Sequence, residues 1–174
     1  MRRVIPLTLT ALAAALALTA CDGGSGGADG AKSKAGSGCA TGAVALEVGS
    51  ASVAPAAGDT GEVPVSITNQ SAPCTLDHFP GVVLRQGDRS VKLPASEGAQ
   101  AQTLKLAKGA SATFTVSYTR GADGDAKALD AGTMEVTLPG GGDAKSFPWK
   151  FGPVAAKGTD SANASVSAFQ QVGD

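Results

Sequence analysis

The sequence has few of the side chains from which catalytic and metal sites are usually built. Its 174 residues include one histidine, one tryptophan and one tyrosine, and aromatic residues amount to only 4%. Nucleophilic triads and most zinc or copper sites depend on histidine, so His78 alone supports neither. Charge of one sign is also missing, since 14 basic and 15 acidic side chains leave a formal net charge of −1. Nucleic-acid partners are therefore not expected, because they require a strongly basic face.

Long apolar runs are scarce as well, and the N-terminus carries the one clear example. Val4–Leu18 is apolar and follows the positively charged pair Arg2-Arg3. As a helix this run would cover roughly 22 Å, which is short of the ~30 Å hydrocarbon core of a bilayer. We therefore expect residues 1–20 to be a signal peptide and not a transmembrane helix. A twin-arginine export signal is the weaker alternative, because the arginine pair lacks the usual polar context.

Only three cysteines are present, and their positions indicate different roles. Cys21 follows Leu18-Thr19-Ala20, a series that resembles the lipobox of bacterial lipoproteins. The resemblance implies cleavage before Cys21 and at least two acyl chains on it, which give a stable anchor in the membrane. The expected location is then the outer face of the bacterial cell membrane. An ordinary secretory cleavage site beside a chance cysteine is the alternative.

The two other cysteines, Cys39 and Cys74, most simply form a disulfide in an exported protein. Such a bond would contribute roughly 3–4 kcal/mol by restricting the unfolded chain. Free or metal-bound thiols are the alternative. Before Cys39, residues 21–38 comprise the lipidated cysteine and a Gly/Ser-rich segment without apolar periodicity. We expect this segment to be a flexible tether with a root-mean-square span of about 20–25 Å.

From Cys39 onward, short alternating runs are separated by Gly, Pro, Asn and Asp, a pattern typical of antiparallel strands. Ser111–Thr119 is the clearest strand. Glu62–Thr68 is a half-buried strand in which Pro64 indicates an edge or a bulge. A hairpin turn is predicted at Gln86-Gly87-Asp88-Arg89. Further strands are predicted at 43–48, 82–85, 90–93, 133–138 and 146–151.

About seven such strands predict an all-β fold, an immunoglobulin-like antiparallel β-sandwich over residues 39–156. A closed barrel is the alternative architecture. Trp149 is expected in the core, on the same face as Phe147 and Phe151, because few aromatic side chains are available to fill it. Residues 157–174 are rich in Ser and Ala and are expected to form a loose polar tail, with a weak strand in 166–172 as the exception.

Short motifs recur in a fixed order along this domain. The series consists of Cys39, the Gly58–Gly61 turn, Thr68-Asn69, Cys74-Thr75-Leu76, Phe79-Pro80-Gly81-Val82 and Leu106-Ala107-Lys108-Gly109 leading into Phe114. Together these motifs resemble a domain-of-unknown-function family of secreted actinobacterial lipoproteins, over residues 39–149. Two features depart from the family, since Asp77-His78 replaces a frequent glycine and the second cysteine pair of many members is absent. The resemblance implies a sandwich fold and export, and it implies no activity, because none is established for the family.

Two loops contain candidate binding residues. The first follows Cys74 and contains His78, Phe79 and Pro80. An inert loop histidine is expected there, with a ligand contact as the alternative. Asp77 is not expected to orient His78, because neighbouring side chains of a strand point apart. No catalytic residue and no cofactor is therefore assigned.

The second loop, residues 121–132, carries Asp123, Asp125 and Asp130. Oxygen-rich loops can hold calcium, but Lys127 occupies the position of the third ligand in EF-hand spacing. A solvated loop is expected, with calcium binding as the weaker alternative. No metal ligand is assigned.

A sandwich on a lipidated tether, without catalytic residues, predicts a non-catalytic binding or envelope-organising module. Recognition in sandwiches usually lies on the end loops, and the expected partner is an envelope protein or a cell-wall polymer. This prediction depends on analogy of fold. A metal or small-ligand carrier and an accessory domain of an enzyme are the alternatives.

Overall fold

The computed structural model describes residues 38–158 and 160–172, and the fold reported below concerns these residues alone. Residues 1–20, Cys21 and the tether up to residue 37 lie outside the described residues. The described chain consists of β-strands and a single 3-10 turn, η1 (Thr41–Ala43), so the prediction of an all-β fold is confirmed. None of its helical segments is long and apolar enough to cross a membrane.

The first sheet is built around two long antiparallel strands. Strands β2 (Thr60–Asn69) and β7 (Ser111–Thr119) pair through nine residues, and β1 (Val44–Val48) lies on the other side of β2. Two short strands share the free side of β7, β12 (Ala164–Val166) and β13 (Gln170–Gln171). The sheet order is therefore β1-β2-β7-β12, with β13 also on β7.

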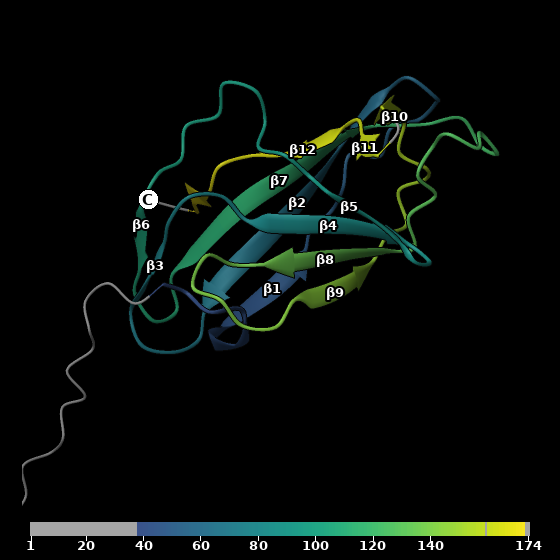
Figure 1. Ribbon diagram of the computed structural model, residues 1–174. Coiled ribbons are helices and arrows are strands. Elements are labelled where there is room, and N and C mark those ends of the chain that lie inside the picture. The colour runs from purple at the N-terminus through teal and green to yellow at the C-terminus, as the bar shows by residue number, and fades with distance from the viewer. Residues whose placement is uncertain (1–37, 159, 173–174) are drawn as a thin grey trace, which may run out of the picture. The chain divides into compact units, whose positions relative to one another are not determined.

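The second sheet has the order β5-β4-β8-β9, again antiparallel throughout. Figure 1 shows β2 and β7 in one layer and β4 and β8 in the other. Gln86 pairs with Arg89 at the end of β4, which confirms the predicted hairpin turn. The bounds of these strands are β4 (Gly81–Gln86), β5 (Arg89–Lys92), β8 (Thr133–Thr137) and β9 (Lys145–Pro148).

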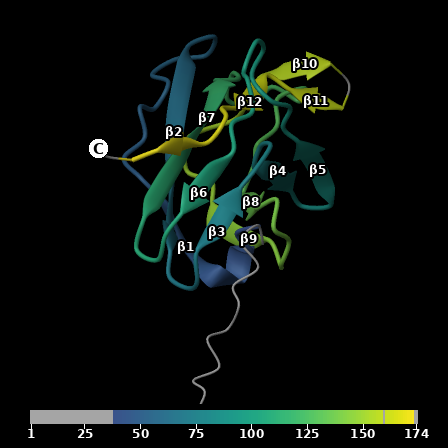
Figure 2. The same ribbon diagram turned by 90° about the vertical axis from the view of Figure 1, so that its left-hand side faces the viewer.

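Two small ladders lie at the ends of the sandwich. Strands β3 (Cys74–Leu76) and β6 (Leu104–Leu106) pair beside the point where the described chain begins, since Gly38 bridges to Thr75. Strands β10 (Ala156–Gly158) and β11 (Ser161–Ala162) pair at the other end. Figures 1 and 2 both place β10 and β11 away from β3.

The core lies between the two sheets and follows the alternation of the sequence. Every second residue of β7 and of β8 is buried, and in β4 the alternate residues Val82 and Leu84 are buried. Each fully buried aliphatic or aromatic side chain contributes about 1.5–3 kcal/mol relative to exposure. Side chains of both inner faces that are at most 1% exposed include Val63, Val65, Ile67, Val82, Leu84, Phe114, Val116, Met134 and Val136.

Trp149 lies in this core, as predicted, with 6% of its surface exposed. Its ring packs edge-on against Tyr118 at 5.1 Å and against Phe151 at 4.9 Å between centroids. The indole N–H donates to the Gly152 carbonyl at 2.7 Å, so its one polar group is paired.

Pro64 is not at a sheet edge, because β2 lies between β1 and β7. The irregularity lies in the neighbouring chain, which leaves the ladder after Val48 and pairs again only at Ser52 with Glu62. The Gly49 N–H donates to the Pro64 carbonyl at 2.9 Å. Because the N–H and C=O positions of one strand residue face the same side, the missing N–H of Pro64 faces this break. The edge is therefore wrong as a prediction, whereas the bulge is confirmed, because residues 49–51 lie opposite only residues 63 and 64 of β2.

The disulfide between Cys39 and Cys74 is formed, with 5.0 Å between the Cα atoms, and both cysteines are buried. The Cys39 N–H also donates to the Thr75 carbonyl at 2.9 Å. On the other side, Gly38 touches Gly140 so closely that a Cβ on Gly140 would collide with it. The first residues of the domain are thus held between β3 and the turn after β8.

The C-terminal residues are part of the sandwich, so the prediction of a loose tail is wrong for residues 160–172. Val166 pairs with Val116 of β7 and is 1% exposed. Phe169 is also 1% exposed, and its ring lies edge-on to Phe114 at 6.0 Å between centroids. The polar composition of the segment concealed these apolar positions, which are few but lie over the core.

Replacing Phe169→Ala should lower the free energy of unfolding by about 3–5 kcal/mol, because a buried aromatic ring would leave a cavity. Urea unfolding followed by circular dichroism would measure the change. Val172→Ala is the control, because Val172 is 50% exposed and should change stability little. Equal stability of the two variants would contradict the packing of this segment.

Replacing both Cys39 and Cys74 by serine should lower the free energy of unfolding by about 2–5 kcal/mol, through loss of the cross-link. The comparison is made with Cys21→Ser in both proteins, so that no third thiol interferes. Adding a reductant should destabilise the disulfide-bonded protein and leave the serine variant unchanged. A reductant effect of the same size on both would show that the cross-link is not the cause.

Candidate functional site

The loop after β3 brings His78 and Asp77 together, contrary to prediction. The Nδ1 atom of the His78 ring lies 3.4 Å from Oδ2 of Asp77. The backbone N–H of His78 donates to Oδ1 of the same carboxylate at 2.9 Å. Contact is made because His78 has a φ of 60°, which turns the chain out of a strand. Adjacent side chains of this left-handed turn converge where those of a strand would diverge.

This pair does not have the arrangement of a catalytic triad. The Thr103 hydroxyl donates to Asp77 at 3.2 Å, so the hydroxyl and the imidazole share the carboxylate, whereas a triad places the imidazole in the middle. The His78 side chain is 79% exposed. Phe79 is half-buried and Pro80 is buried, so both belong largely to the packing of the fold. The loop therefore offers a solvated histidine with no desolvated site beside it.

The second predicted loop is tied to the core at both ends. Leu129 exchanges two backbone hydrogen bonds with Val154, at 2.8 and 2.9 Å. Arg120, the first residue after β7, donates to the Ala54 carbonyl at 3.2 Å and lies 3.4 Å from an oxygen of Asp123. These contacts fix where the loop lies relative to the end of the first sheet.

The three aspartates of this loop line one hollow of about 300 Å³, together with Gln86 and Pro153. Two of the carboxylates already have partners, since Asp123 faces Arg120 and Asp125 accepts the N–H of Lys127 at 2.9 Å. Within residues 38–158 and 160–172, no group of three or more His, Cys, Asp or Glu side chains is placed to hold a metal ion. We define this feature, with Asp123, Asp125 and Asp130, as the acidic hollow.

A larger hollow of about 560 Å³ is lined in part by the same loop. Three cationic side chains line it, Arg89, Lys127 and Lys157, with small residues between them. They come from the start of β5, the 121–132 loop and β10. Ala126 lines both this hollow and the acidic hollow, so the two are neighbours. We call the larger one the cationic hollow.

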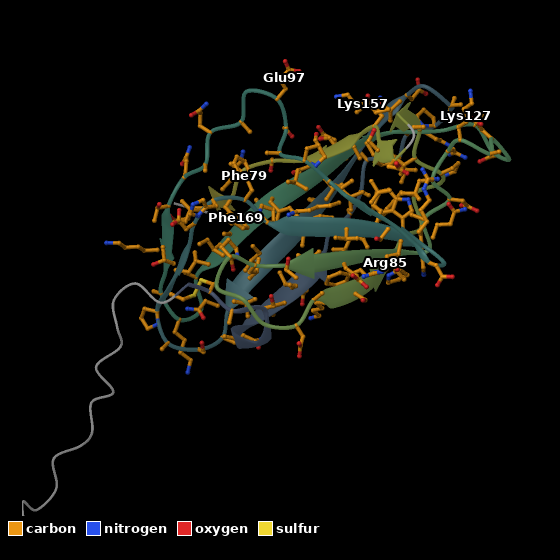
Figure 3. The ribbon with its side chains drawn as sticks, viewed as in Figure 1. Phe79, Arg85, Glu97, Lys127, Lys157 and Phe169 are labelled. Atoms are coloured by element: carbon orange, nitrogen blue, oxygen red, sulfur yellow. A yellow bond between two sulfur atoms is a disulfide. The ribbon has the colours of Figure 1, made fainter. Side chains whose placement is uncertain are left out.

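The structure therefore separates the two predicted loops and adds a third feature. Figure 3 shows Phe79 at one end of the sandwich and Lys127 with Lys157 at the other. No sequence pattern predicts the cationic hollow, because its three cations are far apart in the chain. In the sequence, Lys127 is notable only because it occupies the position of a calcium ligand. Lys157 belongs to residues 157–174, which are expected to form a loose tail.

The sequence model of a family described as a domain of unknown function, DUF4232, matches residues 39–170. The match begins at the first disulfide cysteine and ends in β13, so it spans both sheets and extends beyond the residues that carried the resemblance. A search of curated proteins found no match to the chain. The chain belongs to the domain-of-unknown-function family DUF4232.

Proposed function

We propose that this protein is a membrane-anchored, extracytoplasmic lipoprotein whose β-sandwich is a non-catalytic binding or envelope-organising module. The observation that carries the proposal is the division of the three cysteines. Cys39 and Cys74 are joined in the core, which is typical of an exported domain and leaves Cys21 as the remaining thiol. Cys21 follows an apolar run at the position where a lipobox cysteine would stand.

A binding role is supported by what the end loops contain. Catalysis by acid–base or nucleophilic groups needs side chains oriented towards a common reacting atom. His78 is solvated, and two of the three carboxylates of the acidic hollow are engaged, one with Arg120 and one with a backbone N–H. Two hollows on a loop that is fixed to the core fit recognition of a ligand better than chemistry on it.

The proposed partner is an envelope protein or a cell-wall polymer. The described domain begins at Gly38, which is held beside β3, and the two hollows lie at the opposite end. A tether attached at Gly38 would leave that opposite end free for a partner.

The anchor is tested by replacing Cys21→Ser in bacteria that process lipoproteins, with growth on a clickable palmitate analogue. The wild-type protein should take up the label and sediment with membranes, whereas the variant should do neither, because it has no thiol to acylate. The serine variant of Cys39 and Cys74 is the matched control and should keep the label. Membrane sedimentation of the Cys21→Ser protein equal to that of wild type would overturn the lipid anchor.

A calcium carrier is the second candidate, and the acidic hollow is the observation in its favour. Because two of its three carboxylates have internal partners, we expect calorimetric titration with calcium to give no saturable heat and no rise in melting temperature. A rise that Asp130→Asn abolishes would contradict this expectation and favour the carrier.

A further inference from the structure

The cationic hollow brings three positive charges together in a protein whose acidic side chains outnumber its basic ones. Arg89, Lys127 and Lys157 line one depression, while the chain as a whole has a formal net charge of −1. Among the described residues that line it, none is acidic. The neighbouring hollow is lined by aspartates, one of which, Asp125, accepts the backbone N–H of Lys127. Charges of opposite sign therefore line two neighbouring hollows on one loop.

Three separate segments must fold together to make this arrangement. Arg89 closes the hairpin between β4 and β5, Lys127 stands in the loop that Leu129 fixes to Val154, and Lys157 lies in β10. The position of β10 depends in turn on its pairing with β11 and on the contact of β11 with β5. The three cations are thus brought together by segments that are each held by backbone hydrogen bonds.

We propose that the cationic hollow binds a ligand that carries phosphate groups. Lysine ammonium groups act on phosphate as point charges, and the charge of Arg89 adds to the positive potential of the hollow. Three cationic side chains around one hollow suit a group with two or more negative charges better than a single carboxylate. The small residues Ala126, Ala156 and Gly158 between the cations leave the hollow, of about 560 Å³, open to more than one phosphate.

The position of the hollow indicates the source of the phosphate. Gly38, where the tether joins the domain, lies at the β3 end, whereas Lys127 and Lys157 lie at the end with β10 and β11 (Figure 3). The hollow therefore lies at the end away from the attachment point. We assign its phosphate to a polymer or a free compound, because the flexible tether expected from the sequence, with a span of about 20–25 Å, would let this end of the domain reach partners away from the bilayer. This inference rests on the proposed binding module and names its ligand class.

Calorimetric titration tests the proposal with tripolyphosphate as the probe and the protein as purified from the expressing cells. The wild-type protein should bind tripolyphosphate saturably, and raising the salt from about 50 to 200 mM should weaken binding, because exposed charges are screened. Lys127→Gln with Lys157→Gln should weaken binding about tenfold or more, since two charge-assisted contacts are lost. Both lysines are exposed, so the melting temperature should not change. Arg89 is not substituted, because it also interacts with other residues of the protein and its loss would not test ligand binding alone.

The matched control is Lys105→Gln with Lys108→Gln, which removes the same charge from exposed positions in and after β6. It should bind within about twofold of wild type. Equal loss in both double variants, or no saturable heat for wild type at millimolar tripolyphosphate, would overturn the proposal. Citrate binding as tight as tripolyphosphate binding would overturn the preference for phosphate.

Vesicles separate the two sources of phosphate. Vesicles of phosphatidylglycerol and phosphatidylcholine should not sediment the Cys21→Ser protein, if the hollow serves a polymer or a free compound. Sedimentation that depends on Lys127 and Lys157 would overturn that assignment in favour of a lipid headgroup. Acylation of Cys21 is measured independently, so failure of phosphate binding and failure of the anchor are distinguishable results.

Discussion

The first sheet depends on the antiparallel ladder of nine residue pairs between β2 and β7, which carries β1 on one side and β12 and β13 on the other. Their inner faces supply five of the twelve largest fully buried side chains. These five are Val63, Val65, Ile67, Phe114 and Tyr118. Because the chain has few aromatic residues, aliphatic side chains must fill most of the core, and long strands with strict alternation align such side chains on one face.

The same ladder also positions the end that carries the two hollows. At the end of β7 the Tyr118 hydroxyl donates to the Phe151 carbonyl at 2.8 Å and accepts the Ala54 N–H at 3.3 Å. Gly61 faces the ring, and a Cβ there would collide with it. One buried tyrosine thus ties three segments together. Arg120 continues this function two residues later, through the Ala54 carbonyl and Asp123.

The sandwich therefore has two ends of different character. At one end, the disulfide and the contact of Gly38 with Gly140 hold the start of the domain against the body of the fold. At the other end, the loop between β7 and β8 contributes to a hollow lined by aspartates and to a neighbouring one lined by cations. The proposed binding module would therefore present its charged hollows at the end opposite to Gly38.

The sequence by itself determined those features that depend on local repetition. Alternation of apolar and polar residues places Phe114 and Val116 on one face whatever lies opposite, so β7 and the hairpin at Arg89 were predictable. Because Cys39 and Cys74 are the two cysteines of a domain expected to be exported, a disulfide between them was also predictable. The family resemblance depended likewise on the order and spacing of motifs along the chain.

Only the tertiary structure decided the features that depend on which distant segments meet. Phe169 is an isolated apolar residue in a polar segment, and its burial requires Phe114 to be where the fold puts it. Pro64 is tolerated inside a sheet because the chain after Val48 happens to leave the ladder there. Lys127 and Lys157 line one hollow because the 121–132 loop and β10 come together only in the folded domain. Periodicity is a property of neighbours in sequence, whereas a site is a property of neighbours in space.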